Sequence, residues 1–270
     1  MTNRYLMEDP REAARLEAKA DAPRWMRTHL SHVMSPRATV LDVGAGPGHV
    51  ASAVLRRWPA AKVVAVDVSA GRLAAGAPGG VTPAHWRCCA DACQLPFATG
   101  SFDVVYSRLL LQYVERRGAA VAEMARVTRG GGAVVLFDLD GQLVWHDPVP
   151  GELGALLARV APALRAAGFD PHAGRTLRRL AYAAGLRELS VRVEPYHLIA
   201  GRVPEAERAH WELKLDIARP FLAHALGSPA AADRAVAVFL EFLDAEETLS
   251  YSVAFTVTGR RLRTLSSDSH

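Results

Sequence analysis

Apolar and polar residues follow two different periods along the chain, and the change from one period to the other recurs several times. Residues 39–43 are apolar and β-branched, which predicts a buried strand. Residues 50–58 then carry apolar side chains at helical spacing. The strands predicted in this half of the chain are 39–43, 62–69, 87–92, 102–107 and 133–138. Because they alternate with helices, they predict a parallel sheet with helices on both faces.

The second half of the chain predicts two long strands with a helical stretch between them. Residues 186–200 and 250–264 alternate apolar and polar positions, and the helical stretch 204–247 separates them. We expect an antiparallel pair of edge strands with a helical insert. The other predicted helices are 10–22, 25–33, 152–168 and 176–184. The domain boundaries that follow are an N-terminal helical cap at 1–34, a core at 35–200, a helical lid insert at 201–248, and a closing strand and tail at 249–270.

Three glycines at alternate positions follow the first predicted strand. Gly44, Gly46 and Gly48 allow a sharp turn and a close approach of backbone to a ligand. The helix that begins there points free N–H groups and the positive end of its dipole at that ligand, which favours a carboxylate or a phosphate. The dinucleotide fingerprint requires a third glycine where His49 stands, so a pyrophosphate site is disfavoured.

Acidic residues end the next two predicted strands. Asp67 suits a bidentate hydrogen bond to a ribose diol, and Asp91 ends the third strand. Ligands of parallel sheets lie outside the carboxyl ends of the strands, so both acids, the glycine loop, Ser107 and Arg108 should line one crevice. Asp42 lies inside the first strand, where a buried carboxylate needs partners such as loop N–H groups.

The order of these elements resembles the class I S-adenosylmethionine (SAM)-dependent methyltransferases, in particular the small-molecule branch similar to the ubiquinone and menaquinone biosynthesis enzymes. The resemblance is strong over 38–140 and implies a Rossmann-like, seven-stranded, mostly parallel sheet, with SAM as cofactor. It implies that Asp67 binds the ribose and that Asp91, with the N–H of Ala92, reads the adenine edge. The residues expected to hold the cofactor are Arg15, Asp42, Gly44, Ala45, Gly46, Gly48, Asp67, Val68, Asp91, Ala92 and Ser107.

Candidate catalytic residues are fewer. Tyr5 matches a tyrosine of the family's leader segment, and His146 is expected in a loop, where it can act as a general base on a substrate hydroxyl. Relatives often carry a His-His pair where Gln112 and Tyr113 stand, so no role is transferred from that pair. Gln112 and Tyr113 are instead candidates for lining the substrate pocket, with packing in a helix as the alternative.

Methyl transfer is an in-line displacement, which an enzyme accelerates by alignment and by exclusion of water. The apolar lid favours a small, largely apolar acceptor, such as a natural-product intermediate of secondary metabolism, methylated on carbon, oxygen or nitrogen. A methyltransferase-like partner subunit without turnover is the alternative, and an RNA methyltransferase is less favoured. A metal-dependent methyltransferase would need a magnesium site, for which Asp138 and Asp140 are the available ligands. We predict that no metal is bound. A nicotinamide-dependent reductase would need the glycine spacing of the dinucleotide fingerprint, which this loop lacks.

Composition adds limits. The chain of 270 residues has a net charge of +4, but its basic residues are scattered, so no nucleic-acid partner is expected. Cys88, Cys89 and Cys93 are expected to be small buried hydrophobic residues, because no ligand set completes a metal site. The absence of a long apolar run argues against a membrane span, and the start of the chain predicts a cytoplasmic protein. The lid also suits a homodimer contact.

Overall fold

A seven-stranded mixed sheet forms the centre of the computed structural model, which describes residues 11, 21–75 and 86–263. The strand order is β3-β2-β1-β4-β5-β7-β6. β1 to β5 are parallel, and β7 is antiparallel to both β5 and β6. The strands are β1 Thr39–Val43, β2 Lys62–Asp67, β3 Trp86–Cys89, β4 Phe102–Arg108, β5 Thr128–Asp147, β6 Leu186–Ala200 and β7 Leu249–Arg261. The predicted Rossmann-like architecture with an antiparallel edge pair is confirmed.

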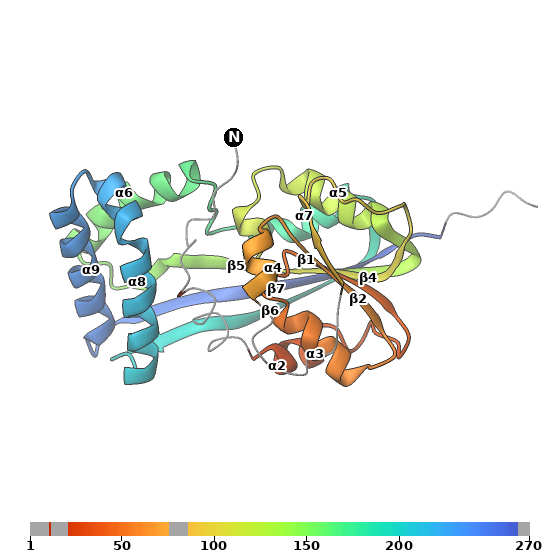
Figure 1. Ribbon diagram of the computed structural model, residues 1–270. Helices are drawn as coiled ribbons and strands as arrows, with labels where there is room; N and C mark the ends of the chain where they lie inside the picture. The colour runs from red at the N-terminus through yellow and green to blue at the C-terminus, as the bar shows by residue number, and fades with distance from the viewer. Residues whose placement is uncertain (1–10, 12–20, 76–85, 264–270) are drawn as a thin grey trace, which may run out of the picture.

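The helices cover both faces of the sheet and extend past one end of it. They are α2 Ala22–His29, α3 His49–Arg57, α4 Ala70–Ala75, α5 Arg117–Val127, α6 Gly151–Ala166, α7 Leu177–Ala183, α8 Glu205–Leu226 and α9 Pro229–Asp244, with short 3-10 turns η1 Leu111–Tyr113 and η2 Gly174–Thr176. Figure 1 shows α2 and α3 on one face and α5 and α7 on the other. The far ends of β5, β6 and β7 carry α6, α8 and α9. No helix in the described part of the chain is both long and apolar enough to cross a membrane.

Successive residues of each inner strand pack on opposite faces. Val40 and Tyr106 belong to the cluster beneath α2 and α3, whereas their neighbours Leu41 and Val105 belong to the cluster beneath α5 and α7. This alternation follows from the pleat of a strand. Because both faces of the sheet are covered, β1 and β4 carry apolar side chains on both of their faces, which is why these segments were predicted to be buried strands.

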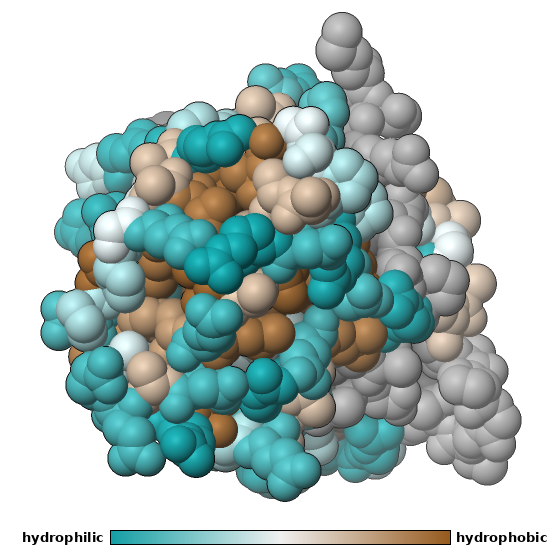
Figure 2. All heavy atoms as spheres, turned by 90° about the vertical axis from the view of Figure 1, so that its left-hand side faces the viewer, coloured by the Kyte–Doolittle hydropathy of each residue, from teal (hydrophilic) through white to brown (hydrophobic). Residues whose placement is uncertain are grey.

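The three helices at the far end form a separate hydrophobic core, which we call the lid. Leu153 of α6, Trp211 of α8 and Phe239 of α9 pack together in it. A turn separates α8 from α9: Gly227 ends α8 with φ +91°, and the Ser228 side chain accepts a hydrogen bond from the N–H of Ala231. Figure 2 views this end of the molecule, where hydrophobic atoms show between hydrophilic side chains.

Several local predictions are corrected. The fifth strand is longer than the predicted 133–138: it begins at Thr128, includes Gly130, Gly131 and Gly132, and continues to Asp147. The third strand ends at Cys89, ahead of Asp91. Cys89 is exposed and not buried. α6, which the sequence assigned to the core, packs in the lid with α8 and α9; the domain boundaries themselves stay predictions.

Candidate cofactor site

The glycine loop forms a tight turn between β1 and α3. Gly44, Gly46 and Gly48 all have positive φ, at +76°, +53° and +81°. A Cβ atom on Gly44 would lie 2.7 Å from Cδ1 of Leu110, whereas a Cβ on Gly46 would meet no atom within 4 Å. Gly44 is therefore required by packing and conformation. Gly46 borders open space, where a ligand can approach the backbone.

Asp67 lies at the end of β2, beside this loop. Its Oδ2 accepts a hydrogen bond from the N–H of Gly46 at 2.9 Å, and its Oδ1 accepts one from the N–H of Ser69 at 2.9 Å. The Arg72 guanidinium also donates to Oδ1, through Nε at 3.2 Å and Nη2 at 2.8 Å. The carboxylate is only 6% exposed. Asp67 therefore contacts the glycine loop directly, so the two features that were predicted separately, the loop and the acidic end of β2, lie together in the structure.

Asp42 is buried inside β1, beneath the loop. Burial raises the pKa of its carboxyl to about 7, although the Tyr106 hydroxyl, the Arg108 guanidinium and the backbone of Ala51 all favour the charged form. Ala51 belongs to the first turn of α3. This position fits the expected role of ordering the loop.

Two neighbouring residues at the end of β4 carry buried polar atoms. Ser107 pairs with Val43 of β1, the residue before the glycine loop. Its Oγ, like Nε of Arg108, is buried and has no hydrogen-bond partner among the described residues. The Arg108 guanidinium carbon is 5.8 Å from the Trp25 ring centroid and 6.0 Å from that of Phe137. The Arg108 guanidinium, which packs beside two aromatic rings and favours the charged form of the buried Asp42 carboxyl, is a candidate for binding an anionic ligand group.

The remaining predicted cofactor residues follow β2 and β3. Val68, next to Asp67, is 63% exposed. Asp91 is exposed beyond the end of β3, and its Oδ1 accepts a hydrogen bond from the N–H of Cys93 at 2.8 Å; Ala92 lies between them and is partly buried. Asp67 pairs with Cys89, so these residues extend the same edge of the sheet away from the glycine loop. Arg15 and Tyr5 lie outside the described residues.

His146 is not in a loop but in the distal part of β5, where it pairs with Ser250 of β7. Its Nδ1 lies 3.0 Å from Oγ of Ser250, and its ring packs against Phe239 and Phe242 of the lid. Burial lowers its pKa, which favours the neutral ring. The structure thus places His146 in the lid core, apart from the residues around the glycine loop, and its role as a general base stays a prediction.

The acids of β5 are engaged by protein groups. Asp140 forms an ion pair with Arg175, with Nη2 to Oδ1 at 2.6 Å, and Nδ1 of His172 lies 3.3 Å from the same oxygen. Asp138 accepts a hydrogen bond from the N–H of Gln112 at 3.1 Å. In the part of the chain that the structure describes, no group of three or more potential ligands is arranged for a metal ion.

The fold and the loop with its flanking acids define a nucleoside-binding α/β protein. A family model described as methyltransferase domain matches residues 41–136. The chain is 32% identical over 196 residues to a malonyl-[acyl-carrier protein] O-methyltransferase of Methylococcus capsulatus, with 63% of this chain and 70% of the relative covered. It is 42% identical over 115 residues to a demethylmenaquinone methyltransferase of Mycolicibacterium vanbaalenii, with 42% and 48% covered.

A solved structure of Haemonchus contortus phosphoethanolamine N-methyltransferase 2 has a TM-score of 0.61 and 16% identity, with 97% of this chain and 61% of the other covered. The chain belongs to the class I SAM-dependent methyltransferases of the small-molecule type. It spans 64% or less of the length of several further relatives with the malonyl-[acyl-carrier protein] name.

Proposed function

We propose that this protein binds SAM above Gly46, across the carboxyl ends of β1 to β4, and transfers its methyl group to a small, largely apolar acceptor. The observation that carries this proposal is the open space at Gly46 next to the ordered carboxylate of Asp67. A ribose diol donates hydrogen bonds, and a carboxylate only accepts them, so Asp67 has the required chemistry. Val68 and Ala92 then offer apolar contacts to the adenine, and Asp91 accepts from its exocyclic amine.

Arg108 is the group that we assign to the carboxylate of the cofactor's methionine portion. It adjoins Ser107, which pairs with the residue before the loop, and its buried Nε is unsatisfied among the described residues. An arginine–carboxylate pair is forked and strong, and burial increases its strength. Arg15, which was also expected to hold the cofactor, lies outside the described residues, and its role stays a prediction.

When bound, the sulfonium of SAM supplies an electrophilic methyl group. The acceptor's nucleophilic atom forms a bond to that methyl as the sulfur–carbon bond breaks, and the acceptor releases a proton if it carries one. The chain's contribution is to hold the two groups in line and to exclude water, which requires no elaborate catalytic set. Tyr113, the last residue of η1, lines the lid cavity, and we expect the acceptor to reach the cofactor past it.

The acceptor is proposed to be a natural-product or other secondary-metabolite intermediate, methylated on carbon, oxygen or nitrogen. The relatives are named for two different acceptors, malonyl-[acyl-carrier protein] and demethylmenaquinone. A cytoplasmic location and a homodimer formed through the lid stay predictions.

Labelled-methyl transfer from SAM to a panel of acceptors, chosen by mass spectrometry of metabolites that co-purify with the protein, tests the proposal. Transfer to at least one acceptor is expected. SAM binding without transfer to any co-purified molecule would favour the alternative, a methyltransferase-like partner subunit that has lost turnover.

A further inference from the structure

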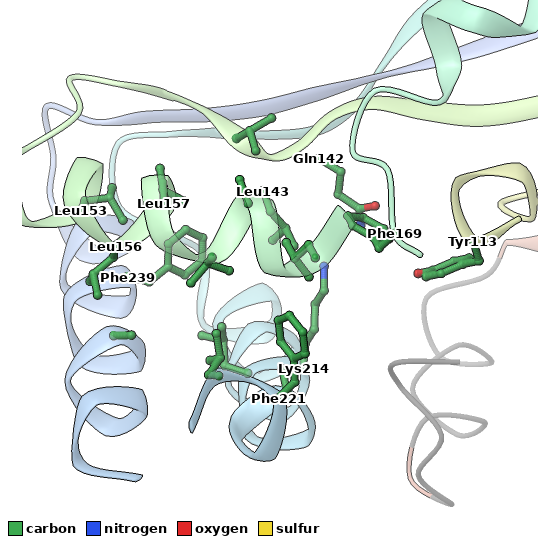
Figure 3. A pocket seen from close by; sticks show the side chains of 18 residues that line it. Tyr113, Gln142, Leu143, Leu153, Leu156, Leu157, Phe169, Lys214, Phe221 and Phe239 are labelled. Atoms are coloured by element: carbon green, nitrogen blue, oxygen red, sulfur yellow. The ribbon is translucent and has the colours of Figure 1, made fainter. Parts of the chain in front are cut away.

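The lid contains a cavity of about 140 Å³ between α6, α8, α9 and the distal part of β5. Its walls are mainly leucine, phenylalanine, alanine and valine side chains, among them Leu157, Phe221 and Phe239. Three polar side chains, those of Tyr113, Gln142 and Lys214, complete the lining. Figure 3 shows these three toward one end of the cavity, near Phe169, and Leu153, Leu156 and Phe239 at the other. The cavity is therefore polar at the end near Tyr113 of η1 and apolar at the end within the lid.

A bulge in β5 builds the polar end. The register between β5 and β7 breaks between Asp140 and Trp145, and Leu143 within the break has a positive φ of 65°. Such a conformation is costly for a leucine, and bulges commonly redirect side chains at functional sites. Here the break places Gln142, Leu143 and Val144 in the cavity wall.

Gln142 presents an unsatisfied acceptor at this end. Its Oε1 is buried and has no hydrogen-bond partner among the described residues. A buried amide oxygen without a donor costs free energy, which a bound ligand with an O–H group would recover. Lys214 supplies the complementary donor, and Figure 3 shows its Nζ pointing toward the same end, near Phe169. One hydroxyl group can donate to Gln142 and accept from Lys214 at the same time.

The size of the cavity limits the apolar part of the ligand. An engineered apolar cavity of about 150 Å³ in another protein stays dry and binds benzene. A cavity of about 140 Å³ therefore takes a group of about the size of a six-membered ring. An ionised carboxylate would pair with the Lys214 ammonium, but it can only accept hydrogen bonds and so leaves Gln142 Oε1 without a donor, whereas a hydroxyl satisfies both groups.

We propose that the lid cavity binds a hydroxylated, ring-sized apolar group of the methyl acceptor, with the hydroxyl between Gln142 and Lys214. This inference rests on the proposed function, because it assigns the acceptor's class at that site. It selects a small hydroxylated ring compound over an acid held as a carboxylate. The polar end of the cavity, next to Tyr113, directs the acceptor toward the crevice above the glycine loop.

Three probes that share one ring test this assignment: phenol, toluene and benzoate. Their dissociation constants are measured by ligand-observed NMR on the full chain saturated with S-adenosylhomocysteine. Phenol is expected to bind about tenfold more tightly than toluene, the effect of a well-satisfied hydrogen bond, and more tightly than benzoate. In Gln142→Met, which keeps the volume and removes the acceptor, the preference for phenol over toluene should fall to about twofold.

A cavity-filling variant separates the site from nonspecific binding. Ala161 of α6 lines the cavity, whereas Ala158 of the same helix is exposed. Ala161→Phe should weaken phenol binding by at least tenfold, and Ala158→Phe should leave it unchanged, with S-adenosylhomocysteine affinity intact in both.

The other possible results of these binding measurements contradict specific parts of the proposal. Equal affinities for phenol and toluene, or a preference that survives in Gln142→Met, would overturn the hydroxyl assignment. Tightest binding of benzoate would overturn it in favour of an anionic group. Phenol binding that Ala161→Phe does not weaken would place the probe elsewhere. If the wild-type chain failed to bind S-adenosylhomocysteine at all, the proposed function would fail before the cavity was tested.

Discussion

The Arg72 guanidinium donates two hydrogen bonds to Oδ1 of Asp67, through Nε at 3.2 Å and Nη2 at 2.8 Å. The N–H of Ser69 donates to the same oxygen, so Oδ1 already has three N–H donors, whereas Oδ2 accepts a hydrogen bond from the N–H of Gly46 at 2.9 Å. A ribose diol that needs both oxygens must share Oδ1 with Arg72 or displace it. The arginine that orders the carboxylate thus also competes with the cofactor for it.

Arg72→Met is therefore expected to tighten S-adenosylhomocysteine binding by about two- to fivefold. The variant lacks the partly exposed Arg72–Asp67 ion pair, whose modest free energy must otherwise be given up when the ribose binds the Asp67 carboxylate. Isothermal titration calorimetry of the variant and the wild type measures this. Weaker binding by the variant would instead show that Arg72 chiefly positions Asp67.

Arg108→Met is expected to weaken S-adenosylhomocysteine binding about tenfold or more, because a charge-assisted pair with the ligand carboxylate is lost. Binding of 5′-methylthioadenosine, which lacks that carboxylate, should change less than about twofold. Arg56→Met, on the exposed side of α3, is the matched control and should alter neither affinity. Equal weakening for both ligands would assign Arg108 a structural role.

Asp138→Asn is expected to change how stability depends on pH. Burial raises the pKa of Asp138 to about 7, from 3.8. Between about pH 4 and pH 7 the unfolded chain has lost this proton and the folded chain retains it, so the contribution of Asp138 to the free energy of unfolding falls as the pH rises. Asparagine lacks this titration. The stability of the variant relative to wild type should therefore rise by up to about 4 kcal/mol across that range and level off above it. Urea unfolding at several pH values measures the difference, and a constant difference would contradict the assignment.

The inner half of the fold was predictable because its signals are local. β1 and β2 are short apolar runs, and the glycines at 44, 46 and 48 directly follow one of them. Asp67 and Ser107 were then placed by a topological rule, since neighbouring parallel strands end at one edge. The contact between Gly46 and Asp67 follows from that rule and is found in the structure.

The distal half of β5 and the site features near it were not predictable in this way. The strand continues past Gly141 only because β7, more than a hundred residues later, pairs with it across a bulge. Sequence patterns do not reveal such long-range pairing, so His146 was expected in a loop and Gln142 was not considered. Arg108 was expected beside Ser107 at the crevice, but its role was not predicted, because its aromatic neighbours Trp25 and Phe137 come from distant parts of the chain.

Calorimetric titration of S-adenosylhomocysteine into the wild type and Asp67→Ala tests the central claim most directly, with Asp233→Ala, an exposed residue of α9, as the control. We predict binding to the wild type, affinity lower by at least about tenfold in Asp67→Ala, and no change in Asp233→Ala. Unchanged affinity in Asp67→Ala would contradict the placement of the nucleoside at the end of β2.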